Sequence, residues 1–338
     1  MIKYLGSKRT LLPAIVGLIK EMPEVRSVLD LFSGTSRVGH ALKKEGYQVF
    51  ANDHNRYAAT LAGCYVQADA TPELLRDAQQ LVVELNALPG KAGYFTDTFC
   101  VQSRFFQPFN GERIDAIRES IQDLALSTDL ENVLLISLME AADRVDSTTG
   151  VQMAYLKQWA KRSFNPLTLR MPDILPASKF GPCEAFELDA IEALGQVEID
   201  LVYLDPPYNQ HKYLGNYHIW ESLVRWDKPE VYGIACKRID VKDRGSEFNS
   251  KPRFEAAFQT LADAVKAKRM IVSFSDEGYL PRETFMRILG GKGPVTVHEF
   301  DYKRYVGAQI GIHSPQGKVV GKVSHLRNKE FLFVVDCR

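Results

Sequence analysis

Cysteine is scarce in this 338-residue sequence, and no two cysteines stand in a C-x-x-C spacing. The five cysteines, at positions 64, 100, 183, 236 and 337, are scattered and odd in number. This argues against a disulfide framework and against a structural zinc site. We expect reduced thiols, no bound metal ion and a cytoplasmic protein.

Long apolar runs and an excess of one charge are also missing. The N-terminal stretch MIKYLGSKRTLLPAIVGLIKEM is interrupted by Pro13 and Gly17 and ends in Lys20 and Glu21, so neither a signal peptide nor a membrane-spanning helix fits. Lys plus Arg and Asp plus Glu number 42 each. Bulk charge therefore indicates neither a nucleic acid nor a membrane partner, and a polyanion site has to be a local patch.

A dinucleotide fingerprint G-x-G-x-x-G is absent too. Residues 27–55, SVLDLFSGTSRVGHALKKEGYQVFANDHN, predict a strand, a turn at Gly34, a helix, a second strand and then Asp53. An acid at this place can accept hydrogen bonds from a ribose diol. One glycine turn plus one acid suits a nucleoside without a pyrophosphate, such as S-adenosylmethionine, although a plain tight turn and a loop aspartate fit the pattern equally well.

The rest of the chain predicts a doubly wound α/β domain with an insertion. Further strands are expected at 199–205 and 269–276, and a helix at 254–268 covers one face of the sheet. Residues 66–183 have a different, mostly helical texture, for example at 131–145, so we assign 1–65 and 184–338 to the core and 66–183 to the insertion. Apolar runs around Pro315-Gln316-Gly317 predict an antiparallel ribbon that closes the sheet.

The strand at 199–205 ends in Asp205-Pro206-Pro207-Tyr208. Both prolines fix φ, so the carbonyls of Asp205 and Pro206 are presented in a rigid, extended turn. The Asp205 carboxylate and a backbone carbonyl can hold the two N–H bonds of an aromatic amine and direct its lone pair at an electrophile. Tyr208 offers a flat face for an extruded base. The alternative is a strand-ending turn with Tyr208 packed in the core.

The stretch NQHKYLGNYHIWESLVRW (209–226) combines aromatic and basic residues and is typical of a mobile lid that meets a nucleic acid. We expect Lys212, Tyr213 and Tyr217 to contact the nucleic acid, and favour the two tyrosines over Trp220 and Trp226.

Two other parts of the chain are candidate nucleic-acid contacts. Residues 151–182 contain Lys161 and Arg162 within a positive patch, and 210–253 are also basic. Residues 100–118 place Arg104, Gln107 and Asn110 where they can meet base edges. A solvated charged face is the competing interpretation for each basic residue.

These motifs together resemble the Dam-like, alpha-group DNA adenine N6-methyltransferases. The match covers KYLGSKR (3–9), LDLFSGT (29–35), Asp53, LDPPY (204–208) and, more loosely, VSFSDEG (272–278), in the alpha-group order. The resemblance implies a Rossmann-like S-adenosylmethionine-dependent methyltransferase sheet, with 66–183 as the target-recognition insertion. The glycine motif reads F-S-G-T where many relatives have F-x-G-x-G, a change that we expect to leave cofactor binding intact. The insertion at 66–183 resembles a set of helical recognition regions more than the short one of Dam, so recognition of GATC is not implied.

Carried over to this sequence, the catalytic residues are Asp205, Pro206 and Tyr208. The cofactor contacts include Asp205 again and a set from the N-terminal part: Tyr4, Lys8, Asp30, Phe32, Ser33, Gly34, Thr35 and Asp53. Tyr4 and Phe32 can face a sulfonium, and Lys8 can pair with the methionine carboxylate.

We therefore expect a site-specific enzyme that methylates a flipped-out adenine in double-stranded DNA, associated with the nucleoid, either beside a separate restriction endonuclease or as a solitary methylase. Cytosine N4 methylation and RNA adenine methylation remain alternatives, as does an inactive DNA-binding relative. A nicotinamide oxidoreductase is disfavoured because the second glycine is missing.

Overall fold

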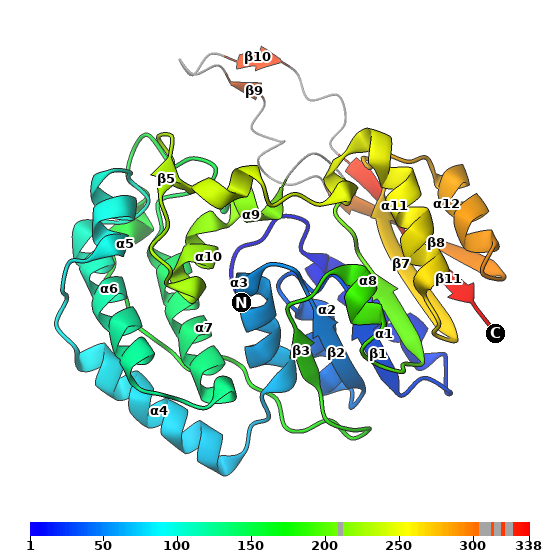
Figure 1. Ribbon diagram of the computed structural model, residues 1–338, viewed down its shortest axis with the longest axis horizontal. Helices are drawn as coiled ribbons and strands as arrows, with labels where there is room; N and C mark the ends of the chain where they lie inside the picture. Colours follow the sequence, from blue (N-terminus) through cyan, green and yellow to red (C-terminus); the bar gives the residue numbers. More distant parts are fainter. Residues whose placement is uncertain (209–211, 304–311, 314–318, 322–326) are drawn as a thin grey trace. The chain divides into compact units, whose positions relative to one another are not determined.

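The computed structural model describes residues 1–208, 212–303, 312–313, 319–321 and 327–338. The chain forms two compact units (Figure 1). Unit 1 comprises Met1–Val197 and Lys212–Gly245, and unit 2 comprises Glu198–His211 and Ser246–Arg338. The predicted insertion at 66–183 lies within unit 1, together with the first strands of the chain.

Unit 1 contains the predicted βαβ unit. Strand β1 (Ser27–Asp30), helix α2 (Arg37–Lys44) and strand β2 (Gln48–Asn52) follow one another, and β1 pairs with β2 in parallel. Strand β3 (Glu184–Phe186) adds to the other edge of β2, also in parallel. The buried runs of β1 and β2 agree with the near-continuous apolar sequence that parallel strands need, whereas β3 is partly exposed.

The N-terminal apolar stretch forms η1 (Lys8–Thr10) and helix α1 (Leu12–Lys20). Pro13 sits in the first turn of α1, where its missing N–H costs no hydrogen bond, so it does not interrupt the helix. No helix in the described ranges has both the length and the apolar character needed to cross a membrane.

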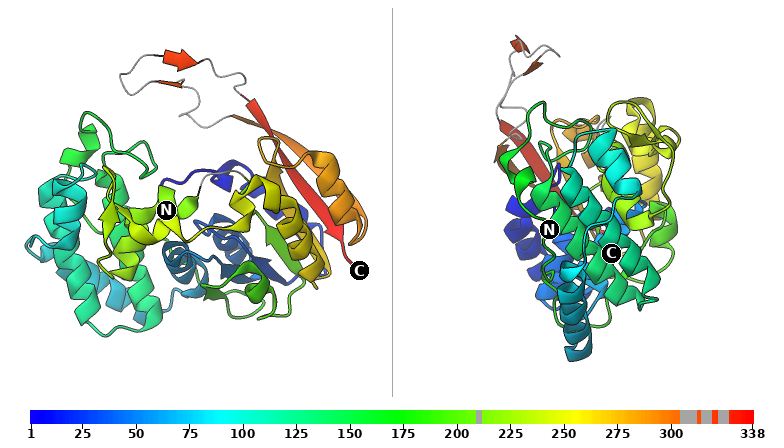
Figure 2. Two further views of the ribbon diagram at one scale, coloured as in Figure 1. Left: turned by 45° about the horizontal axis from the view of Figure 1, so that its top comes forward. Right: turned by 90° about the vertical axis from the view of Figure 1, so that its left-hand side faces the viewer.

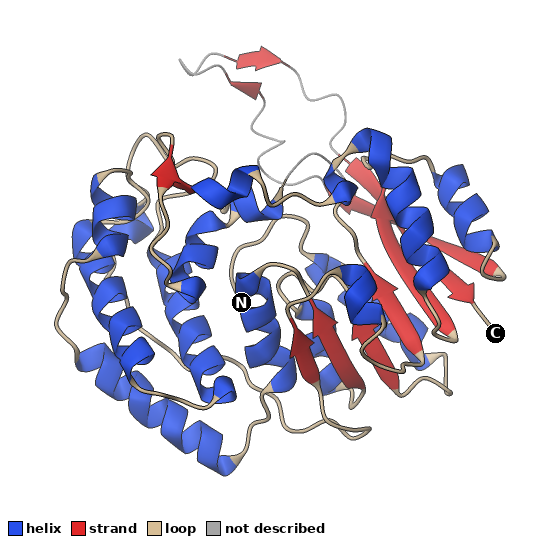
Figure 3. Cartoon of the chain, viewed as in Figure 1, coloured by secondary structure: helices blue, strands red, loops and turns tan. Residues whose placement is uncertain are grey.

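The remaining elements of unit 1 are mostly helical (Figure 3). They are α3 (Arg56–Ala62), η2 (Gly63–Gln67), α4 (Pro72–Ala87), α5 (Tyr94–Thr96), η3 (Asp97–Val101), α6 (Pro108–Asp123), α7 (Thr128–Val145), η4 (Lys161–Phe164), α8 (Ala190–Leu194), α9 (Tyr213–Asn216), α10 (His218–Arg225), the two-stranded ribbon β5 (Val231–Tyr232) and β6 (Lys237–Arg238), and η5 (Ile239–Lys242). Helices α4, α6 and α7 lie side by side (Figure 2). The helix predicted at 131–145 is confirmed as α7.

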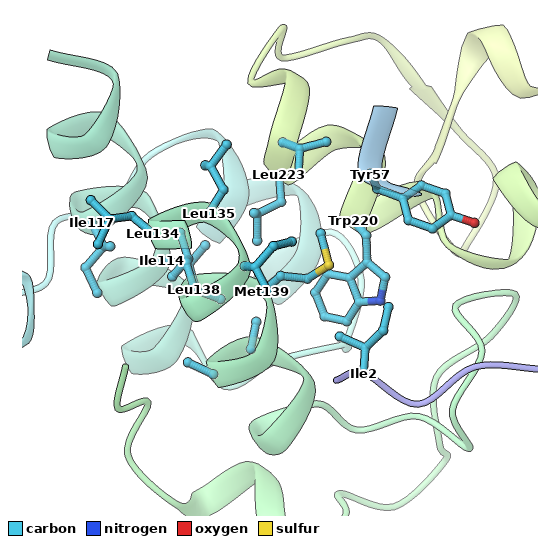
Figure 4. Packing of buried hydrophobic residues seen from close by; sticks show 14 of the residues in the cluster. Ile2, Tyr57, Ile114, Ile117, Leu134, Leu135, Leu138, Met139, Trp220 and Leu223 are labelled. Carbon is cyan, nitrogen blue, oxygen red and sulfur yellow. The ribbon is translucent and has the colours of Figure 1, made fainter. Parts of the chain in front are cut away.

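The core of unit 1 joins residues that are far apart in the sequence. Leu138 and Met139 of α7 lie with Trp220 and Leu223 of α10 in one buried cluster that also contains Ile2 (Figure 4). Trp220 is 1% exposed. This confirms that part of the aromatic stretch 209–226 is ordinary packing, and it attaches α10 to the predicted insertion.

Unit 2 contains β4 (Leu201–Leu204), η6 (Glu247–Asn249), α11 (Lys251–Ala264), β7 (Arg269–Ser275), α12 (Arg282–Gly290), β8 (Val295–Lys303) and β11 (Arg327–Asp336). Strand β4 pairs with β7 in parallel, whereas β11 pairs antiparallel with β7 and β8. The strands predicted at 199–205 and 269–276 and the helix at 254–268 are confirmed, and so is the α/β fold class.

The predicted C-terminal ribbon is present as β9 (Ile312–His313) and β10 (Val319–Gly321), which pair antiparallel. These two strands form a sheet of their own, so the prediction that they close the sheet is wrong; β11 joins β7 and β8 instead. The Pro-Gln-Gly turn of the ribbon lies outside the described residues. All five cysteines are free thiols, and the described part of the chain contains no group of three or more His, Cys, Asp or Glu side chains arranged to hold a metal.

Candidate active site

The turn after β1 is tied to the end of β2. Gly34 adopts φ +50°, a left-handed conformation that favours glycine, and its N–H donates to Asp53 Oδ2 at 3.1 Å. Ser33 N–H donates to the carbonyl of Asn52 at 2.8 Å. The predicted glycine turn and the predicted acid are therefore adjacent in space, as the sequence indicated.

Asp53 presents a fixed carboxylate at this edge. Its Oδ1 accepts hydrogen bonds from the N–H of Asn55 at 2.9 Å and from Asn55 Nδ2 at 3.1 Å. Burial raises the pKa of Asp53, against the lowering effect of His54 and of these hydrogen bonds. A carboxylate has about four acceptor positions. The three bonds that the structure gives to Asp53 thus leave acceptor capacity for a hydroxyl group.

Four tyrosines, which we call the tyrosine stack, gather beside the glycine turn: Tyr4, Tyr57, Tyr213 and Tyr217. The ring of Tyr4 is stacked on Tyr217 with 4.6 Å between centroids and on Tyr213 with 5.3 Å. The hydroxyls of Tyr4 and Tyr57 are 3.3 Å apart. Burial raises the pKa of both Tyr4 and Tyr57 well above the usual range, so the phenols are neutral and offer ring faces to a cation.

The stack is packed directly against the turn. A Cβ built on Gly34 would lie 3.3 Å from ring atoms of Tyr4, and one built on Gly6 would lie 3.2 Å from the Tyr213 hydroxyl. Both glycines also have positive φ, so larger residues are disfavoured at these positions by the backbone conformation as well as by the lack of space. The structure thereby brings together Tyr4, Gly34 and Asp53, three of the predicted cofactor contacts.

The other predicted cofactor residues have more varied surroundings. Lys8 is 7% exposed in η1. In the turn, Phe32 is half-buried and Thr35 is buried. Asp30 is 1% exposed, and its Oδ2 accepts from the N–H of Gly39 at 3.1 Å. Asp30 therefore holds the beginning of α2 against β1, a supporting contact in addition to the predicted binding role.

Three buried polar atoms near the turn have no hydrogen-bond partner within the described ranges. They are Ser33 Oγ, Ser36 Oγ and Asn55 Oδ1. A buried polar group without a partner costs free energy unless a ligand or water satisfies it. Their grouping beside Asp53 therefore indicates a polar ligand at this turn.

Sequence reasoning missed Glu221, which is 0% exposed. Its Oε2 accepts from the N–H of Tyr57 at 3.0 Å, and its Oε1 accepts from Arg225 Nε at 2.7 Å and Arg244 at 2.8 Å. Burial alone would raise its pKa, but these donors outweigh it and leave the pKa below the ordinary value. The only local signal was an acid inside the apolar window of α10, four residues before Arg225.

Unit 2 carries the predicted catalytic motif. Asp205 follows directly after β4, whose four residues are all buried, and Pro206 is buried as well. The ring of Tyr208 meets Phe274 edge-on with centroids 5.3 Å apart, and its carbonyl accepts from the N–H of Tyr279 at 3.2 Å. The predicted place of the motif at a strand end is confirmed. Asn209, Gln210 and His211, the start of the predicted lid, lie outside the described residues.

The structure changes the interpretation of Tyr217, which we expected to contact DNA. It is 0% exposed, and its hydroxyl accepts from the N–H of Leu5 at 2.6 Å. Tyr217 therefore supports Tyr4 from behind. Tyr213 and Lys212 are half-buried, and Lys212 Nζ donates to the carbonyl of Lys242 at 3.5 Å.

Three further candidate DNA contacts, Arg162, Asn110 and Arg104, have partners inside the protein. Arg162 donates to Asp146 Oδ1 from Nε at 2.9 Å and from a terminal nitrogen at 2.6 Å, while the neighbouring Lys161 is exposed. Asn110 is 0% exposed and accepts from the N–H of Leu167 at 2.9 Å, so it braces a loop and cannot meet base edges. Arg104 lies over the ring of Trp159 at 4.8 Å.

A family model described as D12 class N6 adenine-specific DNA methyltransferase matches residues 4–286. The modification methylase StsI of Streptococcus sanguinis is 30% identical over 326 residues, which cover 91% of this chain and 49% of that protein. The type II methyltransferase M.FokI of Planomicrobium okeanokoites is 30% identical over 323 residues, covering 90% of this chain and 49% of that protein. The chain thus spans about half the length of these two relatives.

A relative of similar size is the type II methyltransferase M.NlaIII of Neisseria lactamica. It is 27% identical over 310 residues, which cover 89% of this chain and 90% of that protein. The resemblance inferred from the motifs is confirmed by these matches, and the chain belongs to the D12 class N6 adenine-specific DNA methyltransferase family.

Proposed function

We propose that this protein transfers a methyl group from S-adenosylmethionine to the N6 amine of adenine in double-stranded DNA. The observation that carries the proposal is the Asp205-Pro206-Pro207-Tyr208 sequence directly after the buried strand β4. A carboxylate and a carbonyl held by a rigid backbone are the groups that an exocyclic amine needs in order to be oriented.

The residues around Gly34 fit the proposed cofactor. Asp53 would accept from the ribose hydroxyls, and the partly buried ring of Tyr4 would lie against the sulfonium. Ser33 Oγ and Asn55 Oδ1, both buried without a partner in the described structure, supply further polar atoms for a nucleoside. Lys8 would pair with the methionine carboxylate. When bound, S-adenosylmethionine supplies an electrophilic methyl group.

The chain's own groups prepare the amine. The Asp205 carboxylate and the Pro206 carbonyl would each accept one N–H of adenine, which draws the nitrogen toward tetrahedral geometry and directs its lone pair. Tyr208 would stack on the extruded base, a contact worth about 1 to 3 kcal/mol. This offsets part of the few kcal/mol that extrusion from the duplex costs.

DNA would be held by basic residues that remain accessible, with the insertion at 66–183 as the recognition region. Lys161 supports this assignment because its side chain is exposed. Arg104, which lies over the Trp159 ring and is partly exposed, is a second basic group of the insertion. The similarity to named modification methylases supports a role in a restriction-modification system, with a separate endonuclease that cuts the same site. We assign the protein to the cytoplasm, where it would act on the nucleoid.

The decisive experiment supplies purified protein with tritium-labelled S-adenosylmethionine and plasmid DNA from a host that lacks DNA methylation. We expect label in N6-methyladenine after digestion to nucleosides, no label with Asp205→Ala, and full activity with Asp123→Ala, which removes an exposed carboxylate from the end of α6. Label in N4-methylcytosine would favour the cytosine alternative, and retained activity of Asp205→Ala would refute the proposed mechanism. Sequencing the modified DNA would define the recognition site.

A further inference from the structure

The loop between α7 and η4 contains an unusual number of buried polar residues. Asp146, Ser147, Thr148 and Gln152 are each 2% exposed or less. We call residues 146–165 the bridging segment. Buried polar side chains in a loop need specific partners, so their bonds show which parts of unit 1 this segment holds.

Gln152 makes three hydrogen bonds to one short stretch of chain. Its N–H donates to the carbonyl of Asn216 at 2.7 Å, its carbonyl accepts from His218 Nε2 at 3.0 Å, and its side-chain Oε1 accepts from the N–H of Ile219 at 2.8 Å. Burial lowers the pKa of His218 to about 3. The imidazole is therefore neutral, and Nε2 carries the hydrogen because a carbonyl can only accept.

The stretch held by Gln152 is the junction between α9 and α10. The chain leaves helical geometry at Tyr217, with φ −133° and ψ 29°. Tyr217 is the N-cap residue of α10, and its side chain makes no capping hydrogen bond. The first N–H groups of a helix have no acceptor within the helix. Gln152 supplies one of these acceptors from a distant loop and thereby fixes where α10 begins.

Tyr217 lies at the centre of this junction and supports the predicted cofactor contact. It is fully buried, stacks on Tyr4 at 4.6 Å and accepts the N–H of Leu5 at 2.6 Å. Tyr4 in turn covers Gly34. A change in the direction of the Tyr217 ring therefore reaches the face on which the sulfonium is proposed to rest.

The first residue of the bridging segment holds the residue that precedes Tyr4. Asp146 Oδ1 accepts from Lys3 Nζ at 2.8 Å, and Lys3 directly precedes Tyr4 in the chain. One loop thus contacts residues that neighbour both stacked tyrosines in the sequence. These are Lys3, which precedes Tyr4, and Asn216, His218 and Ile219, which flank Tyr217.

We propose that Gln152 is a positioning residue for the cofactor pocket, acting through the α9–α10 junction to set the Tyr217 and Tyr4 rings. The proposal rests on the proposed function, because it takes the tyrosine stack as the place of the sulfonium. The proposal predicts that Gln152, which does not contact the ligand, controls the affinity for S-adenosylmethionine. The groups that orient the adenine amine should be unchanged.

The test measures the dissociation constant of S-adenosylmethionine by titration calorimetry and the steady-state constants on plasmid DNA. Gln152→Leu keeps the size of the side chain but leaves the Ile219 N–H without its acceptor, so we expect about ten-fold weaker binding. KM for S-adenosylmethionine should rise by a similar factor, while kcat at saturation stays within about two-fold. Gln152→Glu retains an acceptor oxygen and should restore binding to within about three-fold of the wild type.

The matched control is Asn110→Leu, which also removes a buried amide that holds this part of the chain. Asn110 donates to the carbonyls of Ser163 and Asn165 at 3.2 and 3.0 Å and has no bond to α9 or α10. We expect it to lower the melting temperature as Gln152→Leu does, without weakening cofactor binding. If Gln152→Leu does not fold, Gln152→Asn, whose shorter side chain withdraws the oxygen from Ile219, takes its place.

The outcomes are distinct. Wild-type affinity in Gln152→Leu, or equal weakening in Asn110→Leu, would overturn the positioning role. A wild-type protein that does not bind S-adenosylmethionine would instead refute the proposed function.

Discussion

The buried carboxylate of Glu221 gives the sharpest stability prediction. It accepts from the N–H of Tyr57 at the beginning of α3, two residues after Asn55, and from Arg225 and Arg244. Glu221→Ala would leave that N–H without its acceptor and both guanidinium groups without a carboxylate that now lies 2.7 to 2.8 Å away.

The expected magnitude follows from the surroundings of the partners. Removing one member of a buried ion pair typically costs about 3 to 5 kcal/mol. Arg225 and Arg244 are about one-third exposed, and each keeps a second acid, Glu187 and Asp240 respectively. We therefore expect about 3 kcal/mol for Glu221→Ala, the lower end of that range. Glu221→Gln retains an oxygen for the Tyr57 N–H and should cost about 1 to 2 kcal/mol.

The pH dependence supplies a second check. Because the folded pKa of Glu221 is lowered, its stabilisation is fully present above the ordinary glutamate pKa and is lost as pH falls through the folded value. The difference in unfolding free energy between the wild type and Glu221→Gln should thus be constant from about pH 6 to 8 and shrink below about pH 4.

Urea denaturation followed by tryptophan fluorescence is a suitable assay, because all three tryptophans, Trp159, Trp220 and Trp226, belong to unit 1. Glu84→Ala removes an exposed acid from α4 and serves as the control. If Glu221→Ala unfolds within about 1 kcal/mol of that control, the ion-pair argument is wrong.

Three further predictions concern other parts of unit 1. Gly34→Ala places a Cβ at positive φ and 3.3 Å from the Tyr4 ring, so cofactor binding should weaken by at least about ten-fold; unchanged binding in a calorimetric titration would contradict this. Lys161→Gln should reduce the salt dependence of DNA binding by about one ion without lowering the melting temperature. Arg162→Gln should lower the melting temperature because it removes a cationic partner of the buried Asp146 carboxylate; equal effects of the two variants would contradict this. Burial raises the pKa of Asp143 to about 6, so ionisation of this carboxyl opposes folding as pH rises. The unfolding free energy of Asp143→Asn should therefore increase by up to about 3 kcal/mol relative to that of the wild type between pH 4 and 8. A difference between the two proteins that does not change with pH in urea titrations would refute this.

The elements that were predictable from sequence are those set by local pattern. The apolar run of 27–30, the turn at Gly34 and the acid at 53 specified a βαβ unit because strand, turn and helix signals followed within a few residues. The same reasoning placed Asp205 at a strand end, since a buried strand cannot continue through two prolines.

The support around the site was not predictable, because its contacts join distant positions. Tyr4 meets Tyr217 across more than two hundred residues, and Gln152 meets Ile219 across 67. Periodicity indicates that an aromatic residue is buried, but not which ring it stacks on. A lid of DNA-contacting tyrosines was a reasonable expectation for 212–217, and only the burial of Tyr217 shows that its ring faces inward.

The same limit applies to charge, and it bears on how DNA would be held. Residues 210–253 are basic in sequence, but Arg238 makes a two-bond pair with Asp227 at 2.7 Å and also meets Asp240, while Arg225 and Arg244 share Glu221. Burial opposes the charge of Arg238, yet these acids raise its pKa above the ordinary value. The guanidinium therefore stays charged, and the carboxylates of Asp227 and Asp240 compensate its charge within the protein. A chain with equal numbers of basic and acidic residues has little long-range attraction for DNA once its arginines are paired in this way. Affinity should then depend on few phosphate contacts and on shape and base contacts, and its dependence on salt should be shallow.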